Sequence, residues 1–108
     1  MKGIDISKYQ GTNIDFAAIK AADYDFVIVN AGYGNSLGQE DPQFDRNVKG
    51  ALAAGLYVGA YYVGYAMSTE DALIEAATFR TILTPYVGKL FFQSPMITSM
   101  PGLHTIPR

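Results

Sequence analysis

The chain has 108 residues, a formal charge of −2, no cysteine and no tryptophan, and 49% of its residues are hydrophobic. This composition suits one small folded domain, or part of a larger one, and is too apolar for a disordered chain. It excludes disulfide frameworks and thiol nucleophiles, and the 8 basic and 10 acidic residues, scattered along the chain, predict no nucleic-acid partner.

The first strand–helix unit is predicted at the N-terminus. A short apolar segment at 3–6 is interrupted by Asp5, and a helical pattern of apolar residues follows at 14–22. The β-branched run at 26–29 then opens a second unit and is typical of a strand buried on both faces.

The second helix is expected to have Asp41 as its cap and Pro42 at its first position, with Gly55 just past its end. A strand-like segment follows at 56–65. The third helix is expected from Ser68 or Thr69, and a fourth strand begins at 89–92. The buried stripe of the third helix is predicted at four positions: Ala72, Ala76, Phe79 and Leu83.

This alternation predicts an α/β fold with a parallel sheet and right-handed crossovers. It describes either a small open α/β domain or about half of an eight-unit barrel. The strand and helix periods vanish after the fourth strand, where three prolines occur. We therefore expect residues 1–90 to form the domain and 91–108 to be a tail outside it.

Asp5 is the first candidate site residue. A carboxylate in an apolar strand is costly to bury unless it is paired, and the carboxyl end of a parallel strand is where α/β folds place their sites. The alternative is an exposed aspartate that ends the strand. Asp15, Asp23, Asp25, Asp45 and Glu75 fit caps, turns and solvated helix faces.

Tyrosines at the end of the third strand form the second candidate. Their flat rings and hydroxyl groups suit stacking against sugars, although strand propensity and core packing also explain them. Tyr57 fits packing better, whereas Tyr61, Tyr62 and Tyr65 are open to either role.

The glycine-rich segment 32–38 superficially resembles a dinucleotide-binding turn. The next helix signals come late, and no acidic residue lies between Asp45 and Glu70 to bind a ribose. The single histidine, His104, leaves little for a histidine-built metal site or a catalytic triad. We expect no metal, no organic cofactor and no membrane span, and the charges near the N-terminus disfavour a signal peptide.

The sequence resembles glycoside hydrolase family 25, the Chalaropsis-type lysozymes that include phage endolysins. The resemblance spans about residues 2–90. It is carried by segments in the family's order and spacing, chiefly 3–11 (GIDISKYQG), 25–34 (DFVIVNAGYG), 50–56 (GALAAGL) and 58–61 (VGAY).

The resemblance implies the N-terminal half of a TIM-like (β/α) barrel that cleaves β-1,4 links between N-acetylmuramic acid and N-acetylglucosamine in extracellular peptidoglycan. Asp5 matches the family's first active-site aspartate, while Tyr33, Tyr61, Tyr62 and Tyr65 would contact the sugars. Three positions depart from the family: Tyr9 stands for a tryptophan, Asn30 for an arginine or lysine, and Tyr62 for a frequent histidine.

The family's fourth strand carries an Asp-x-Glu motif whose glutamate is the catalytic acid. The corresponding segment 90–100 (LFFQSPMITSM) contains no carboxylate, and no acidic residue follows Glu75. Glycosidic cleavage needs both a proton donor and a second group at the sugar. We therefore expect this chain to be a truncated, inactive member, or alternatively a non-catalytic glycan-binding module.

A change of reading frame near 89–92 is our hypothesis for this loss. The codons of Met96 and Ile97 begin ATG-AT, so the frame that starts at the last base of the methionine codon reads GAT, an aspartate. Permitted codon choices allow the sequence Phe-Pro-Val-Pro-Tyr-Asp-Tyr-Glu-Tyr in that frame. The aspartate is forced and the glutamate is allowed.

Overall fold

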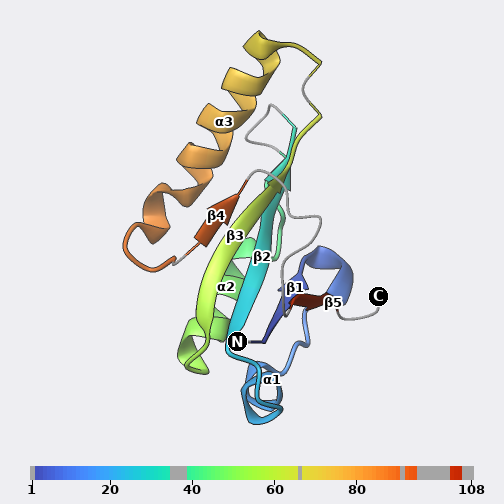
Figure 1. Cartoon of the computed structure of the whole chain (residues 1–108), viewed down its shortest axis with the longest axis vertical. Helices are drawn as coiled ribbons and strands as arrows, with labels where there is room; N and C mark the ends of the chain where they lie inside the picture. Colours follow the sequence, from blue (N-terminus) through green and yellow to red (C-terminus); the bar gives the residue numbers. More distant parts are fainter. Residues whose placement is uncertain (1, 35–38, 66, 91, 95–102, 106–108) are drawn as a thin grey trace.

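The computed structural model describes residues 2–34, 39–65, 67–90, 92–94 and 103–105 (Figure 1). Within them one parallel sheet has the strand order β4-β3-β2-β1-β5. The strands are β1 (Gly3–Ile6), β2 (Phe26–Tyr33), β3 (Tyr57–Val63), β4 (Phe92–Ser94) and β5 (Leu103–Thr105). The helices are α1 (Phe16–Ala21), α2 (Phe44–Ala53) and α3 (Thr69–Leu83), with short 3-10 turns η1 (Lys8–Gln10) and η3 (Thr84–Tyr86).

Each of the first three strands is followed by a helix and then by a parallel neighbour in the sheet. Ile4 pairs in register with Val27, and Val27 pairs with Val58. The predicted α/β fold with parallel strands alternating with helices is therefore confirmed. In Figure 1 the four strands β1 to β4 lie side by side in chain order, with α2 on one face of the sheet.

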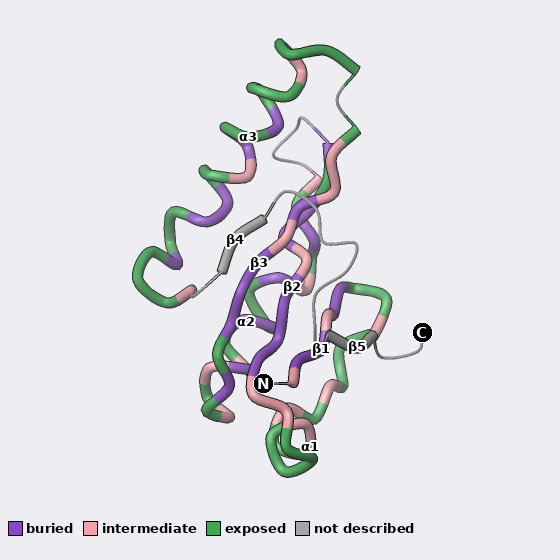
Figure 2. Tube along the Cα trace, viewed as in Figure 1, coloured by how far each residue is buried: buried purple, intermediate pink, exposed green. Residues whose placement is uncertain are grey.

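The core lies between the sheet and α2. Alternate residues of β1, β2 and β3 point to one face, where they meet the apolar side of the helix. The core residues of these four elements are Ile4, Ile6, Val27, Val29, Ala31, Val58, Ala60, Tyr62, Phe44, Val48 and Ala51. Figure 2 shows these buried stretches along β2, β3 and the sheet-facing side of α2. Asp5, Asn30 and Tyr61 occupy the intervening positions and so face the other side of the sheet.

Helix α2 begins at Phe44, later than the sequence predicts, and Gln43 occupies its N-cap without a side-chain hydrogen bond. Asp41 is not the cap. Its backbone N–H donates to the carbonyl of Ala31 at 2.9 Å, which ties Asp41 to the end of β2. Because this hydrogen bond holds Asp41 beside β2, the helical backbone begins only after Asp41.

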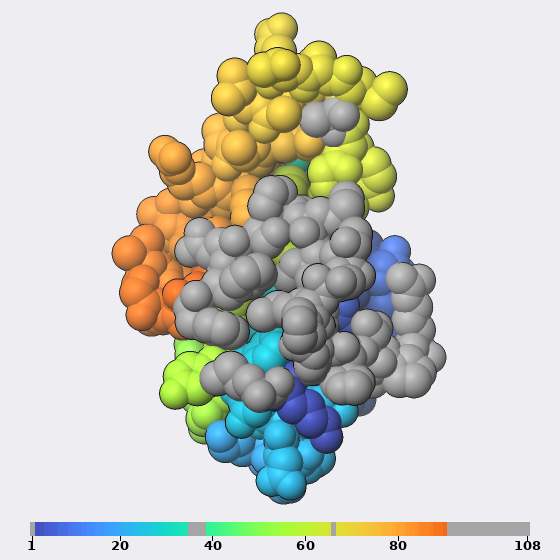
Figure 3. All heavy atoms as spheres, viewed as in Figure 1, coloured from blue at the N-terminus to red at the C-terminus, as the bar shows by residue number. Residues whose placement is uncertain are grey.

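The buried side of α3 also differs from the prediction. Phe79 and Leu83 face the core as expected, but Ala72 and Ala76 are exposed. The other buried positions are Glu75, Thr78 and Ile82. Because α3 lies along one flank of the sheet, only part of its circumference is covered; Figure 3 shows it in yellow to orange, with α1 in blue at the opposite end.

Two described stretches of the last segment, β4 and β5, join the sheet, one at each edge. β4 pairs with β3 close to the predicted fourth strand. β5 pairs with β1, with Gly3 opposite Leu103, although the side-chain pattern predicts no strand there. The free edge of a strand offers a row of backbone donors and acceptors to any extended segment, whatever its side chains.

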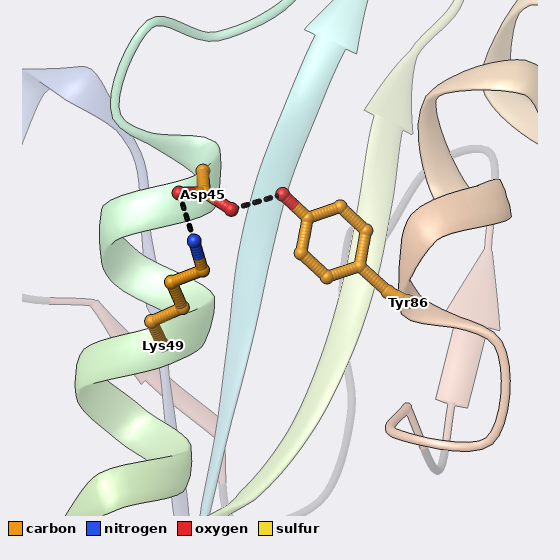
Figure 4. A network of polar contacts seen from close by, with 3 residues as sticks. All are labelled: Asp45, Lys49 and Tyr86. Carbon is orange, nitrogen blue, oxygen red and sulfur yellow. Dashed lines mark hydrogen bonds and ion pairs between the residues drawn. The ribbon is translucent and has the colours of Figure 1, made fainter.

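A polar network links α2 to the segment after α3 (Figure 4). The Tyr86 hydroxyl donates to Asp45 at 2.6 Å, and Lys49 forms an ion pair with the same carboxylate at 2.9 Å. The hydrogen bond from Tyr86 and the one from Lys49 lower the pKa of Asp45. Burial, followed by the Asp45 carboxylate, raises the pKa of Tyr86. Tyr86 also packs edge-on against Phe44, with ring centroids 5.1 Å apart.

Candidate functional site

A hollow of about 220 Å³ opens at the carboxyl ends of β1, β2 and β3. Parallel strands bring their carboxyl ends to one edge of the sheet, so residues from three distant segments meet there. Lys8 and Tyr9 follow β1, and Asn30 and Tyr33 come from the end of β2. Val63 is the last residue of β3, and Tyr65 lies just beyond it. The lining, which we call the aromatic hollow, consists of Lys8, Tyr9, Asn30, Tyr33, Val63 and Tyr65.

Two of the predicted sugar-binding tyrosines meet in the aromatic hollow. Tyr33 is 41% exposed and Tyr65 is 66% exposed. Their rings form an edge-to-face pair with centroids 6.1 Å apart and an interplanar angle of 88°. Such a pair presents two differently oriented apolar surfaces to solvent, which suits the faces of successive sugar rings.

Tyr9 adds a third exposed ring that was not among the predicted substrate residues. It lies in η1, and the Lys8 ammonium sits 5.4 Å from its ring centroid. A capping box holds this turn, because Ser7 Oγ accepts a hydrogen bond from Tyr9 N at 3.2 Å and Gln10 Oε1 accepts one from Ser7 N at 2.7 Å. The sequence feature that could have identified Tyr9 is its position in the turn that follows the first strand.

The other two predicted tyrosines, Tyr61 and Tyr62, do not line the hollow. Tyr61 is half-buried and pairs in register with Asn30. Tyr62 is only 2% exposed, and its hydroxyl donates toward the carbonyls of Tyr33 and Gly34 at 2.9 and 2.7 Å. Burial, with a contribution from the Glu75 carboxylate, raises the pKa of the Tyr62 hydroxyl. The predicted substrate contact of Tyr62 is therefore corrected, since its ring is packed inside the molecule.

Asp5 lies in the middle of β1, in register with Ile28. The residue is half-buried, and its Oδ1 is buried without a hydrogen-bond partner in the described part of the chain. A buried carboxylate oxygen without a donor is costly, and such atoms are rare in folded proteins. Packing and hydrogen bonding within the described residues therefore give no reason for a carboxylate at this position.

Asp41 supports the floor of the hollow, a role that the sequence did not reveal. The residue is 5% exposed. Its Oδ2 accepts hydrogen bonds from Lys8 N at 2.9 Å and Asn30 Nδ2 at 3.0 Å, and its Oδ1 accepts one from Gln43 N at 2.8 Å. One carboxylate thus joins the turn after β1, the end of β2 and the start of α2. In the sequence it was indistinguishable from a helix cap.

Glu75 also departs from its predicted place on a solvated helix face. It is 8% exposed, and its Oε2 accepts a hydrogen bond from Tyr65 N at 2.8 Å. Asp15 is the helix cap that was expected, since its Oδ1 accepts from Ala18 N at 3.0 Å.

Among the described residues no group of three or more histidine, cysteine or acidic side chains lies close enough to hold a metal ion. In the same residues no helix combines the length and apolar character needed to cross a membrane. The glycine-rich segment 32–38, whose resemblance to a dinucleotide-binding turn is superficial, lies partly outside the described residues.

The sequence profile of glycosyl hydrolases family 25 matches residues 4–89. The chain belongs to this family. The resemblance seen in the sequence is thereby confirmed, and Asp5, Asp41, Glu75 and the aromatic hollow all lie in the matched range. No curated protein gave a significant match to the chain.

Solved structures support the assignment. A muramidase from Trichobolus zukalii is 32% identical, with a TM-score of 0.66 over 73% of this chain and 36% of that one. The modular autolysin LytC from Streptococcus pneumoniae is 30% identical, with a TM-score of 0.72 over 85% of this chain and 21% of that one. The lysozyme from Streptomyces coelicolor is 31% identical, with a TM-score of 0.64 over 73% and 35%. The chain thus spans about a third or less of these relatives.

Proposed function

We propose that this chain is the N-terminal half of a muramidase barrel, in which residues 1–90 carry part of the site for peptidoglycan and 91–108 are unrelated to the family. The relatives named above support the substrate class, and LytC has also been solved in complex with a synthetic peptidoglycan ligand. In the whole enzyme the reaction would be hydrolysis of β-1,4 links between N-acetylmuramic acid and N-acetylglucosamine in the extracellular cell wall.

One observation carries the proposal: an aspartate with an unpartnered, buried oxygen lies in β1, whose carboxyl end adjoins a hollow lined by exposed tyrosines. Asp5 would stabilise the positive charge that develops on the sugar, or position the group that attacks it. Tyr33, Tyr65 and Tyr61 would contact the sugar rings, and Tyr33 and Tyr65 provide the exposed surfaces for stacking.

The chain has no group for the second catalytic role. Hydrolysis needs an acid that protonates the leaving oxygen. The buried carboxylates of Asp41 and Glu75 accept hydrogen bonds from backbone N–H groups, and neither of them lines the aromatic hollow. No acidic residue follows Glu75. We therefore propose that the chain as written binds glycan strands and does not cleave them.

The test compares the chain as written with an alternate-frame version. In that version residues 91–108 are replaced by the product of the gene's alternate reading frame, which contains Asp-x-Glu and runs to the stop codon of that frame. Each is mixed with purified cell walls, and co-sedimentation and turbidity are measured. We expect both proteins to sediment with the walls and only the alternate-frame version, extended as its gene dictates, to clear them. Clearing by the chain as written would overturn the proposal.

The second candidate is a glycan-binding module that was never catalytic. It is favoured by the absence of any carboxylate in 90–100, together with the exposed Tyr33 and Tyr65. Sequencing the gene separates the two candidates. If the alternate frame holds no Asp-x-Glu codons and binding to walls persists, the binding module is the better description.

A further inference from the structure

Two buried side chains lie directly behind the exposed tyrosines of the aromatic hollow. Glu75 of α3 is 8% exposed, and Tyr62 of β3 is 2% exposed. Neither lines the hollow, and the proposed function uses neither of them. Each of them instead holds the backbone beside one of the two exposed rings.

Glu75 holds Tyr65. Its Oε2 accepts a hydrogen bond from the backbone N–H of Tyr65 at 2.8 Å. A buried carboxylate is costly without donors, and a hydrogen bond to a charged acceptor is stronger than one between neutral groups. The other carboxylate oxygen lies beside Gly64, 3.4 Å from the position that a Cβ would take there. The carboxylate thus fixes the backbone at the point where β3 has ended and Tyr65 turns into the hollow.

Tyr62 holds Tyr33. Its hydroxyl lies 2.9 Å from the carbonyl oxygen of Tyr33 and 2.7 Å from that of Gly34. A phenol has one proton, so the two carbonyls share a single donor. The ring itself is fixed by stacking on Phe79, with centroids 5.2 Å apart and an interplanar angle of 29°. The end of β2 is therefore tied to a side chain of β3.

Both ties lead back to α3. Glu75 and Phe79 are four residues apart on this helix and therefore share one face. Figure 1 shows α3 running back from the carboxyl end of β3 along the flank of the sheet. The helix supports Tyr65 through Glu75, and it supports Tyr33 through Phe79 and Tyr62.

We propose that Glu75 and Tyr62 are positioning residues that set the geometry of the Tyr33–Tyr65 pair, and so the spacing of the two surfaces offered to a sugar chain. The edge-to-face arrangement, with 6.1 Å between centroids, is the quantity that they control. The use of that pair for sugars rests on the proposed function. The role of Glu75 and Tyr62 in setting the geometry of the pair does not depend on the proposed function.

The first arm of the test needs no ligand. The chain is labelled with ¹³C in its tyrosine rings, and the Tyr65 resonances are assigned through Tyr65→Phe. Because the rings of Tyr33 and Tyr65 pack against each other, Tyr33→Leu should change the chemical shifts of Tyr65 relative to the parent. The Tyr33→Leu variant therefore gives the reference for a lost ring contact. We expect Glu75→Ala and Tyr62→Phe to move the Tyr65 resonances toward the chemical shifts measured in Tyr33→Leu. Glu75→Gln retains an acceptor for Tyr65 N and should stay close to the parent.

The second arm measures binding of chitotetraose, a neutral β-1,4 tetramer of N-acetylglucosamine. We expect Glu75→Ala and Tyr62→Phe each to weaken binding about five-fold, the effect of losing one hydrogen bond from the support. In a Tyr65→Ala background Glu75→Ala should have almost no further effect, which a merely structural role would not produce. Tyr57→Phe, at the exposed start of β3, is the matched control and should bind like the parent.

The two arms separate the two ideas. If no variant, including the parent, binds chitotetraose or cell walls, the proposed function fails while the ring spectra still test the positioning role. If Glu75→Ala and Tyr62→Phe fold and leave the Tyr65 resonances and the affinity unchanged, the inference is overturned. Should Glu75→Ala not fold, Tyr62→Phe alone decides, because it removes one oxygen and keeps the stacked ring.

Discussion

The carboxylate of Asp41 accepts a hydrogen bond from the side-chain amide of Asn30 at 3.0 Å, and the same oxygen accepts one from the backbone of Lys8 at 2.9 Å. Asn30 and Lys8 both line the aromatic hollow, whereas Asp41 is buried behind them. The shape of the hollow therefore depends on a residue that a ligand would not touch.

Asp41→Ala should destabilise the protein by about 2–4 kcal/mol, because three donors lose their acceptor in a buried place. Asp41→Asn keeps one acceptor oxygen and should cost about half as much. Urea unfolding followed by circular dichroism measures both. Asp15→Ala, which removes the exposed cap of the short helix α1, is the control and should cost about 1 kcal/mol. A loss for Asp41→Ala no larger than for Asp15→Ala would contradict this role.

The Tyr86–Asp45 hydrogen bond predicts a pH dependence. The pKa of Asp45 is lowered from its ordinary 3.8, so the network stabilises the fold above that value and the contribution is lost as the pH falls through the lowered pKa. Tyr86→Phe should therefore reduce the stability lost between about pH 5 and pH 3. The effect should stay below about 1 kcal/mol because Asp45 is largely exposed.

Thermal melts across that pH range give the comparison. Lys49→Met is the matched control, since the ion pair lies on the surface and Tyr86 is the larger cause of the pKa shift. A steeper acid dependence in Tyr86→Phe than in the parent would show that the sign is wrong.

Gly3 is a place where the sheet has no room for a side chain. A Cβ there would lie 2.0 Å from the buried ring of Phe26. Gly3→Ala should cost about 1–3 kcal/mol through overpacking. The double variant Gly3→Ala with Phe26→Leu should be less destabilised than the sum of the two single changes, because the smaller side chain leaves space for the methyl group. Simple additivity in urea unfolding would argue against the clash.

Asp5 should behave as a residue kept for function. Its Oδ1 is buried without a donor in the described residues, so Asp5→Asn should leave the melting temperature of the chain unchanged or raise it. In the alternate-frame version the same change should reduce wall clearing by at least about 100-fold, since the group that stabilises charge on the sugar is weakened. A clear loss of stability with clearing retained would place Asp5 among the packing residues.

The first four strands and the three α-helices follow from local patterns in the sequence, as do some of the candidate site residues. Hydrophobic period and β-branched runs predicted β2 and α2. A carboxylate in an apolar strand pointed to Asp5 and the end of the third strand pointed to Tyr65, whereas Tyr33 was implied by the family resemblance. The misplaced residues depend on partners far away in the chain. Asp41 resembles a helix cap in the sequence because its hydrogen bond with Lys8 N joins residues 33 positions apart. Glu75 resembles a solvated residue because no pattern in the sequence indicates that Tyr65 N donates to it.

Tyr61 and Tyr62 show a second kind of limit. Adjacent residues of a strand point to opposite faces, so one of the two had to be buried, and two tyrosines in a row do not reveal which. The assembled sheet decides it, because Tyr62 shares a face with Val58 and Ala60 in the core. β5 is a third case, since its pairing with β1 uses backbone groups that every residue has.

The central claim is that this chain carries a sugar site with one of the two groups that hydrolysis needs. Release of new reducing ends from purified peptidoglycan tests it most directly, with the chain as written and the alternate-frame version assayed side by side. The account predicts no release by the chain as written and sustained release by the alternate-frame version. Release of reducing ends by the 108-residue chain, abolished by Asp5→Asn, would contradict it.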